Sequence, residues 1–119
     1  MDIVNKTKSQ SLVTNVIVPK TMRERMRGLL GRDSLETGSG MLFYNCGWVH
    51  TFFMRFEIDL VFISRDHRVV HTNSALKPNR FSKICLGASM TLELPAGVVA
   101  QTGTEVGDKL QFNVSPLSD

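Results

Sequence analysis

The sequence has no hydrophobic run long enough to cross a membrane as a helix, which takes about 20 consecutive apolar residues. Its start, Met1 to Val13, is polar and lacks the apolar stretch of about 7–15 residues found in a secretory signal. Cysteine is scarce as well, because Cys46 and Cys85 are the only two. A chain that builds its own core in a reducing compartment does not need a disulfide. We therefore expect a cytoplasmic protein with two free thiols.

Signatures of common catalytic, metal and nucleic-acid sites are also missing. The sequence contains no nucleophile elbow, no glycine-rich phosphate loop and no internal repeat. Cys46 and His50 are possible zinc ligands, but a zinc site needs three or four ligands and no second Cys/His pair follows. Aromatic residues do not alternate with basic residues along a strand, as a nucleic-acid platform requires. We expect no metal and no cofactor, and we disfavour a nucleic-acid partner.

What the sequence does contain is the composition of one globular domain. It has 119 residues, of which 42% are hydrophobic and 21% are charged. These are ordinary values for a folded domain, and the length leaves little room for a second core. Residues 1–11 are polar with little periodicity, whereas apolar residues recur from Leu12 onward. We predict a flexible leader over residues 1–11, a single β-rich domain over 12–115 and a tail over 116–119.

One short helix is predicted near the start of this domain, at about 21–31. Thr21 and Glu24 have the spacing of a capping box, in which both side chains accept hydrogen bonds from backbone N–H groups of the first turn. Gly31 is suited to end the helix in the left-handed conformation. Apolar residues recur at helical spacing and predict a stripe buried against a sheet. They are Met22, Met26, Leu29 and Leu30.

The helix also carries much of the positive charge of the chain. Between positions 20 and 32, five basic residues accompany one acidic residue, while the whole chain has a formal net charge of +3. Such a patch is either a solvated helix face or an attractor for phosphate or an acidic partner. Arg23 and Arg27 lie on the outer side of the predicted helix and are candidates for binding a partner. The basic residues are Lys20, Arg23, Arg25, Arg27 and Arg32.

Short β-type segments separated by turn residues make up the rest of the chain, as in a sandwich or barrel. Apolar residues from Leu12 to Val18 begin the first strand, and Pro19 ends it. A long loop is predicted between Asn73 and Leu86, where the pattern weakens. The remaining predicted strands are Met41–Tyr44, Val49–Met54, Ile58–Ser64, Arg68–Thr72, Ser89–Leu94 and Leu110–Val114.

The segment around the predicted strand Val49–Met54 combines aromatic and polar residues. Side chains alternate on an extended chain, so Cys46, Trp48 and His50 are predicted to share one face. Several phenylalanines lie in apolar, strand-like surroundings, and most of them are predicted to be core residues. They are Phe52, Phe53, Phe56 and Phe62.

Three residues are candidates for catalysis, namely His50, Asp59 and Glu93. His50 has the chemistry of a general base that Asp59 or Glu93 would orient, and Cys46 is a possible thiolate nucleophile. Asp59 interrupts the apolar run 58–63, so its carboxylate must be exposed, paired or bonded to donors. Arg55 is the nearest candidate partner. The alternative is a structural carboxylate that holds backbone amides or an arginine.

Short motifs lie at 25–30, 40–43, 50–55, 58–62, 92–97 and 107–108. In this order and spacing they resemble the prokaryotic domain-of-unknown-function family 192, also called uncharacterised protein family 0127. The resemblance covers about residues 16–112. Phe53-Met54 and Arg55-Phe56 stand where many members have Trp-Met and Asn-Thr, so the chain resembles a histidine-threonine subtype. The resemblance implies a mainly β sandwich of jelly-roll type with one short helix, no established activity, and some relatives that are exported or lipid-anchored.

Taken together, the sequence favours a small non-enzymatic binding or accessory module over an enzyme. Its partner would be a protein or small molecule bound at a polar pocket near His50, Arg55 and Asp59. One alternative is a small hydrolase or lyase that uses His50 with Asp59 or Glu93. A further alternative is weak nucleic-acid binding through the basic helix.

Overall fold

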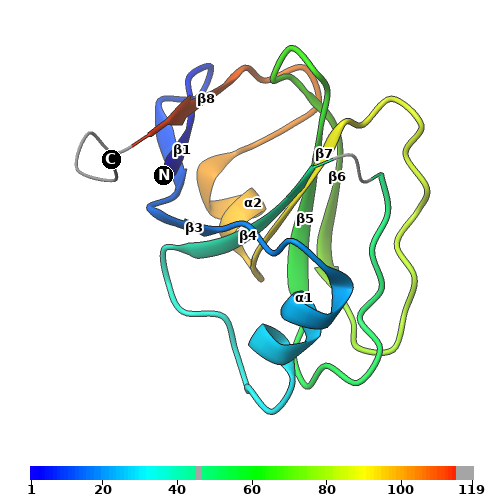
Figure 1. Ribbon diagram of the computed structural model, residues 1–119. Coiled ribbons are helices and arrows are strands. Elements are labelled where there is room, and N and C mark those ends of the chain that lie inside the picture. Colours follow the sequence, from blue (N-terminus) through cyan, green and yellow to red (C-terminus); the bar gives the residue numbers. More distant parts are fainter. Residues whose placement is uncertain (45–46, 115–119) are drawn as a thin grey trace.

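The computed structural model describes residues 1–44 and 47–114, which form a single, mainly β domain with two sheets and two short helices (Figure 1). In the smaller sheet, strands are ordered β2-β1-β8 and all pairings are antiparallel. In the larger sheet the order is β3-β4-β7-β5-β6, where β3 runs parallel to β4 and the other pairings are antiparallel. The strands are β1 (Asp2–Asn5), β2 (Gln10–Val13), β3 (Asn15–Ile17), β4 (Ser39–Tyr44), β5 (Ile58–Ile63), β6 (Val69–Leu76), β7 (Met90–Pro95) and β8 (Leu110–Asn113), and the helices are α1 (Met22–Leu29) and α2 (Val98–Thr102).

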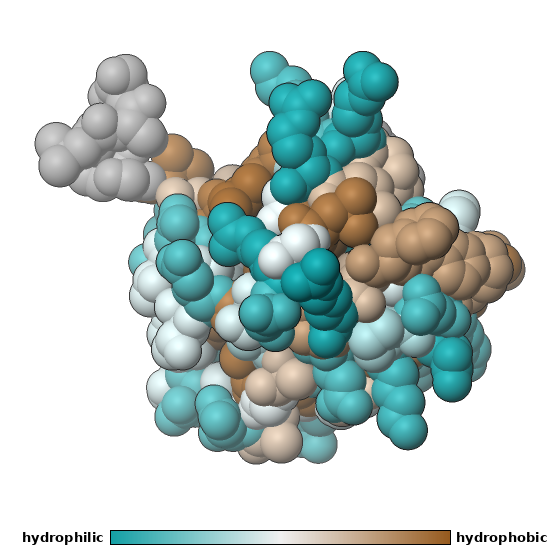
Figure 2. All heavy atoms as spheres, turned by 90° about the horizontal axis from the view of Figure 1, so that it is seen from below, coloured by the Kyte–Doolittle hydropathy of each residue, from teal (hydrophilic) through white to brown (hydrophobic). Residues whose placement is uncertain are grey.

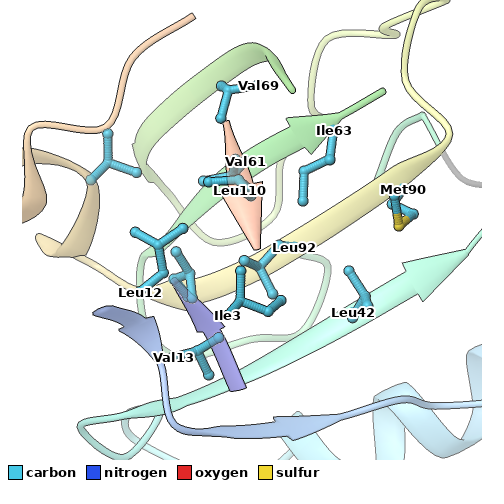
Figure 3. Close-up of a cluster of buried hydrophobic side chains, with 12 residues drawn as sticks. Ile3, Leu12, Val13, Leu42, Val61, Ile63, Val69, Met90, Leu92 and Leu110 are labelled. Carbon is cyan, nitrogen blue, oxygen red and sulfur yellow. The ribbon is translucent and has the colours of Figure 1, made fainter. Parts of the chain in front are cut away.

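Two hydrophobic clusters bury both faces of the larger sheet. One packs Ile3 and Leu110 of the smaller sheet against residues such as Leu92 (Figure 3). The other packs Leu29 of α1 against residues such as Leu60. Because neighbouring residues of a strand point to opposite faces, the two clusters lie on opposite sides of the sheet. This explains why every residue of β5 is buried.

The predicted flexible leader is instead part of the smaller sheet. Residues 1–11 contain β1 and the start of β2, and the side chain of Ile3 is fully buried. β1 also pairs with β8, so Ile3 lies opposite Phe112. The prediction of a leader over residues 1–11 was therefore wrong, because one of the two strands that pair with β1 is β8, at the other end of the described chain, and a partner so distant leaves no local pattern. The predicted tail over 116–119 lies outside the described residues.

The predicted start and end of the helix are confirmed. The side chain of Thr21 accepts a hydrogen bond from the backbone N–H of Glu24 at 3.1 Å. In return, Glu24 Oε2 accepts from the N–H of Lys20 at 2.7 Å, one residue before the position that a capping box uses. Gly31 has a φ of 81°, in the left-handed region expected after a helix end.

The predicted buried stripe of the helix was wrong at two of its four positions. Met22 and Leu30 are 49% and 45% exposed, whereas Arg25 and Leu29 are buried. The helix is turned so that Arg25 reaches Glu93 on β7. An ion-pair partner on a distant strand thus overrides the hydrophobic periodicity.

Five of the predicted strands after the helix are confirmed to within a few residues, as β4, β5, β6, β7 and β8. β6 continues to Leu76, so the predicted loop starts later than Asn73, and Thr14 divides the first predicted strand into β2 and β3. The predicted strand Val49–Met54 was wrong, because this segment is irregular and, among the described residues, its only strand-type bridge joins His50 to Phe81. The sequence also did not predict α2. The jelly-roll topology stays a prediction.

No helix in the described part of the chain is long and apolar enough to cross a membrane.

Candidate functional site

A buried ion pair joins α1 to the larger sheet. Nε and Nη2 of Arg25 both donate to Oε1 of Glu93, at 2.9 and 2.5 Å. The side chains of Arg25 and Glu93 are 1% and 0% exposed. Nη2 of Arg25 also donates to the backbone carbonyl of His50 at 2.6 Å, and the guanidinium carbon lies 5.7 Å from the ring centre of Phe43. One arginine therefore connects the helix, a central strand and the irregular segment after Gly47.

The two carboxylate oxygens of Glu93 differ in their hydrogen bonding. Among the described residues, Oε2 of Glu93 has no hydrogen-bond partner. Burial raises the pKa of Glu93 above its usual range, and the charge and hydrogen bonds of Arg25 oppose this shift. Burial is the larger effect, as expected for a carboxylate far from water.

The ring of His50 contacts its own segment. Nδ1 of His50 accepts a hydrogen bond from the backbone N–H of Phe52 at 3.3 Å, and the two rings stack with centres 5.1 Å apart. Burial lowers the pKa of His50, and the positive charge of Arg25 lowers it further. Both effects favour the neutral ring, and the hydrogen bond from Phe52 requires Nδ1 to be the nitrogen without a proton.

This lowered pKa predicts a pH dependence of stability that His50 controls. The unfolded chain binds a proton near pH 6.5, whereas the folded chain does so only at lower pH. The contribution of neutral His50 is therefore fully present above pH 6.5 and is lost as the pH falls toward the folded pKa. We expect an NMR titration to place the His50 pKa below 6.5. We also expect the stability of the His50→Gln variant to fall less than that of the parent protein as the pH drops below 6.5. A titration at or above 6.5 would contradict this expectation.

Asp59 holds backbone amides on the opposite face of the sheet. Its Oδ1 accepts from the N–H of Ala75 at 2.8 Å, and its Oδ2 accepts from the N–H groups of Gly97 and Val99 at 3.1 and 2.9 Å. Asp59 neighbours Leu60 on β5, and Leu60 lies opposite Glu93, so Asp59 points away from the Glu93 side. Of the two open interpretations, this geometry is that of a structural carboxylate at the start of α2.

Arg55 lies apart from Asp59 as well. Its side chain is 64% exposed and has an ion-pair distance of 3.8 Å to Asp33, which is itself 88% exposed. The structure therefore brings Arg25, Glu93 and the His50 carbonyl together. Within the described residues, neither Asp59 nor Arg55 shares a hydrogen bond with His50.

Arg23 and Arg27 are exposed on α1, as the helical pattern predicts. A groove of about 280 Å³ runs between α1 and β3, with apolar residues such as Ile17 and Met41 and charges of both signs in its lining.

No group of three or more His, Cys, Asp and Glu suited to a metal ion occurs in residues 1–44 and 47–114. The candidate nucleophile and metal ligand Cys46 lies outside the described residues.

The feature that sequence reasoning missed is an exposed aromatic surface. It is formed by two loops, residues 47–57 and 77–88, and we call it the loop face. Phe53 is 75% exposed and Phe81 is 62% exposed. Phe53 is one of the four phenylalanines of which most were predicted to be core residues. Figure 2 shows hydrophobic side chains projecting at one side of the molecule, where Figure 1 places these loops. The exposure of a phenylalanine in loop 47–57 depends on how this loop packs against loop 77–88, and the sequence pattern of one loop does not show that packing.

Hydrogen bonds clamp the two loops together. Oγ1 of Thr51, a fully buried residue, donates to the carbonyl of Lys77 at 2.6 Å and accepts from the N–H of Arg80 at 3.0 Å. The N–H of Cys85 donates to the carbonyl of Gly47 at 2.8 Å. A Cβ at position 47 would lie 2.5 Å from the carbonyl oxygen of Cys85, so this approach requires glycine. The rings are therefore presented on a fixed backbone.

Aromatic contacts tie the exposed rings to one another. Phe52 and Phe81 meet edge to face with ring centres 4.7 Å apart, and Trp48 and Phe81 lie 6.0 Å apart. Phe53 has a φ of 66°, a left-handed conformation that is strained for a bulky residue. Its N–H donates to Oδ1 of Asn79 at 3.0 Å, which links the strained residue to the second loop.

Comparisons with known proteins agree with the fold and with the resemblance found in the sequence. The model of the DUF192 family, described as Uncharacterized ACR, matches residues 3–112. A UPF0127 protein of Thermococcus sibiricus is 29% identical over 94% of this chain and 75% of its own length. A UPF0127 protein of Pyrococcus furiosus is 38% identical over 55% of each chain.

Two crystal structures share the fold at 21% identity. A protein of unknown function from Novosphingobium aromaticivorans has a TM-score of 0.78 and covers 94% of this chain and 84% of its own. A protein from Sinorhizobium meliloti, described as a proposed transcription regulator, has a TM-score of 0.76 and covers 92% of this chain and 89% of its own.

Proposed function

Because the chain belongs to the DUF192 family, whose description assigns no activity, we propose its function from the site itself: a non-enzymatic binding module that acts through the loop face. The observation that carries this proposal is the exposure of Phe53, Phe81 and Trp48 on two clamped loops. Large apolar residues exposed together mark interaction sites more often than chance. Aromatic rings also supply much contact area at a low entropic cost.

The hydrogen bonding of the candidate acids supports binding over catalysis. Both oxygens of Asp59 accept from backbone amides, so this carboxylate is already used by the fold. Glu93 is paired with Arg25 in the interior. A general base must reach the proton it removes, and among the described contacts His50 has neither acid as an orienting partner.

The proposal keeps part of the pocket expected from the sequence. His50 and Arg55 both belong to loop 47–57 and lie beside the exposed rings along the chain. Asp59 instead accepts hydrogen bonds from Ala75 and the start of α2, so it supports the fold rather than the binding surface. Arg23 and Arg27 are exposed on the neighbouring helix, which Arg25 ties to this loop through the His50 carbonyl, and they remain candidate contacts to an acidic partner.

An aromatic anionic dye tests whether the loop face binds at all. Anilinonaphthalene sulfonate fluoresces on accessible apolar surface, and Trp48 is the only tryptophan, so energy transfer from Trp48 reports dye bound nearby. We expect dye binding to the folded protein and a loss of most of the transfer signal in the double variant Phe53→Gly with Phe81→Ser.

Two features make this variant informative about binding rather than folding. Glycine suits the positive φ at position 53, so Phe53→Gly alone is expected to unfold at the same temperature or higher. Val106→Ser is a matched control, because Val106 is 63% exposed in the turn before β8. Unchanged energy transfer in the double variant, or no transfer in the parent protein, would refute binding at the loop face.

A further inference from the structure

We infer that the partner of the loop face is the surface of a bilayer rich in anionic lipids. The inference rests on the proposed binding role of the loop face and adds the chemistry of the partner. Its basis is the combination, on loops 47–57 and 77–88, of protruding apolar side chains with basic side chains.

Large apolar side chains on these two loops are mostly exposed to water. Ile84 is 65% exposed and Leu86 is 94% exposed, in addition to Phe53 at 75% and Phe81 at 62%. These four residues lie on two loops that hydrogen bonds join, and Phe81 also contacts the rings of Trp48 and Phe52. Exposed apolar side chains of this kind can enter the boundary between headgroups and acyl chains. An interfacial segment of this kind buries its apolar side about 5–10 Å into that boundary.

The charges of the second loop complement an anionic surface. Residues 77–88 contain Lys77, Arg80 and Lys83 and no acidic residue. These side chains are long enough to keep their charges at headgroup level while the neighbouring apolar residues enter the bilayer. Lysine is depleted in the interior of protein–protein interfaces. The mixture of lysine with protruding leucine, isoleucine and phenylalanine therefore favours a lipid surface over a protein partner.

The backbone of the loop face is already organised for this contact. Thr51 and Ser82 fasten the two loops through hydrogen bonds to Arg80 and Val49. Phe53 keeps its ring outside in a strained left-handed conformation that Asn79 stabilises. Strain held by neighbouring residues occurs preferentially where function needs it. A preorganised surface loses little entropy on binding.

Vesicle sedimentation tests this inference with the full chain. We expect the protein to sediment with phosphatidylcholine vesicles that contain phosphatidylserine, and to stay in solution with vesicles of phosphatidylcholine alone. The emission of Trp48 should shift to shorter wavelength on the anionic vesicles. Because each basic side chain contributes about fivefold to affinity for an anionic surface, Arg80→Glu with Lys83→Glu should weaken binding about 25-fold or more.

A second double variant tests whether the apolar side chains of the loop face enter the bilayer. Ile84→Ser with Leu86→Ser should weaken vesicle binding about tenfold or more, since each removed side chain forfeits its transfer from water. Lys6→Glu and Val106→Ser change exposed residues elsewhere and should bind like the parent protein.

The outcomes separate this inference from the proposed function. Dye binding at Trp48 without any sedimentation would overturn the lipid partner and leave a binding surface for a protein. Equal sedimentation with neutral vesicles, or vesicle binding that survives both double variants, would overturn the lipid inference as well. Absence of both dye and vesicle binding would refute the loop face itself.

Discussion

Replacing Arg25 with alanine is expected to lower the free energy of unfolding by about 3–5 kcal/mol, the usual cost of leaving one member of a buried ion pair alone. Glu93 would keep a carboxylate with no exposed surface, and the His50 carbonyl would lose its guanidinium donor. Chemical denaturation with urea, monitored by circular dichroism, measures this loss. The loss should be largest at neutral pH and shrink as the pH falls, because protonation removes the unpaired charge of Glu93, whose pKa is already raised.

Two further variants test the cause of that loss. Arg27→Ala changes an exposed arginine on the same helix and should alter stability by no more than about 0.5 kcal/mol. Arg25→Met combined with Glu93→Met removes both charges and should recover most of the stability, as in other buried pairs. Equal losses in Arg25→Ala and Arg27→Ala would show that the ion pair does not anchor the helix.

Replacing Asp59 with alanine should cost about 3–5 kcal/mol, because three backbone N–H groups lose their acceptor. A buried donor without a partner costs about 1–3 kcal/mol, and the two partly buried donors, those of Ala75 and Gly97, are expected at the lower end of this range. The loss should be concentrated around α2, whose first turn Asp59 holds through Gly97 and Val99. Hydrogen exchange at the amide of Val99 should therefore accelerate more than global unfolding requires. Denaturation curves and exchange rates measured on the same samples check both parts.

Asp59→Asn is the graded version of this experiment. Asparagine has one acceptor oxygen in place of two, so a loss between those of the parent and the alanine variant is expected. Asp33→Ala removes an exposed carboxylate and should change stability by no more than about 0.5 kcal/mol. A stable Asp59→Ala protein with normal exchange at Val99 would show that this carboxylate is not structural, and would return it to the list of candidate functional groups.

Short-range sequence patterns predicted much of the fold. The Thr21 cap and the left-handed Gly31 follow from contacts within one or two turns, so sequence spacing alone locates them. Strands such as β5 were predicted because both faces of the larger sheet are buried there and leave apolar runs such as 58–63. The structural use of Asp59 was one of two open interpretations, since a carboxylate inside an apolar run needs donors.

The parts that could not be predicted depend on distant partners. Arg25 turns inward because Glu93 lies on β7, and no helical period records a partner 68 residues away. Ile3 is a core residue because β8 completes its sheet. Phe53 and Phe81 are exposed because two irregular loops fasten to each other, and an irregular loop has no period from which exposure can be read.

The pairing of β1 with β8 has a consequence for synthesis on the ribosome. β1 lies between β2 and β8, so one of its edges stays open until Leu110–Asn113 have left the exit tunnel. Ile3 and Leu12 cannot complete their cluster before that moment, because Leu110 belongs to the same cluster. Contacts between segments so far apart in sequence form late and slowly. We therefore expect nascent chains that end before β8 to be cut readily by protease, and nascent chains that display β8 beyond the tunnel to become resistant.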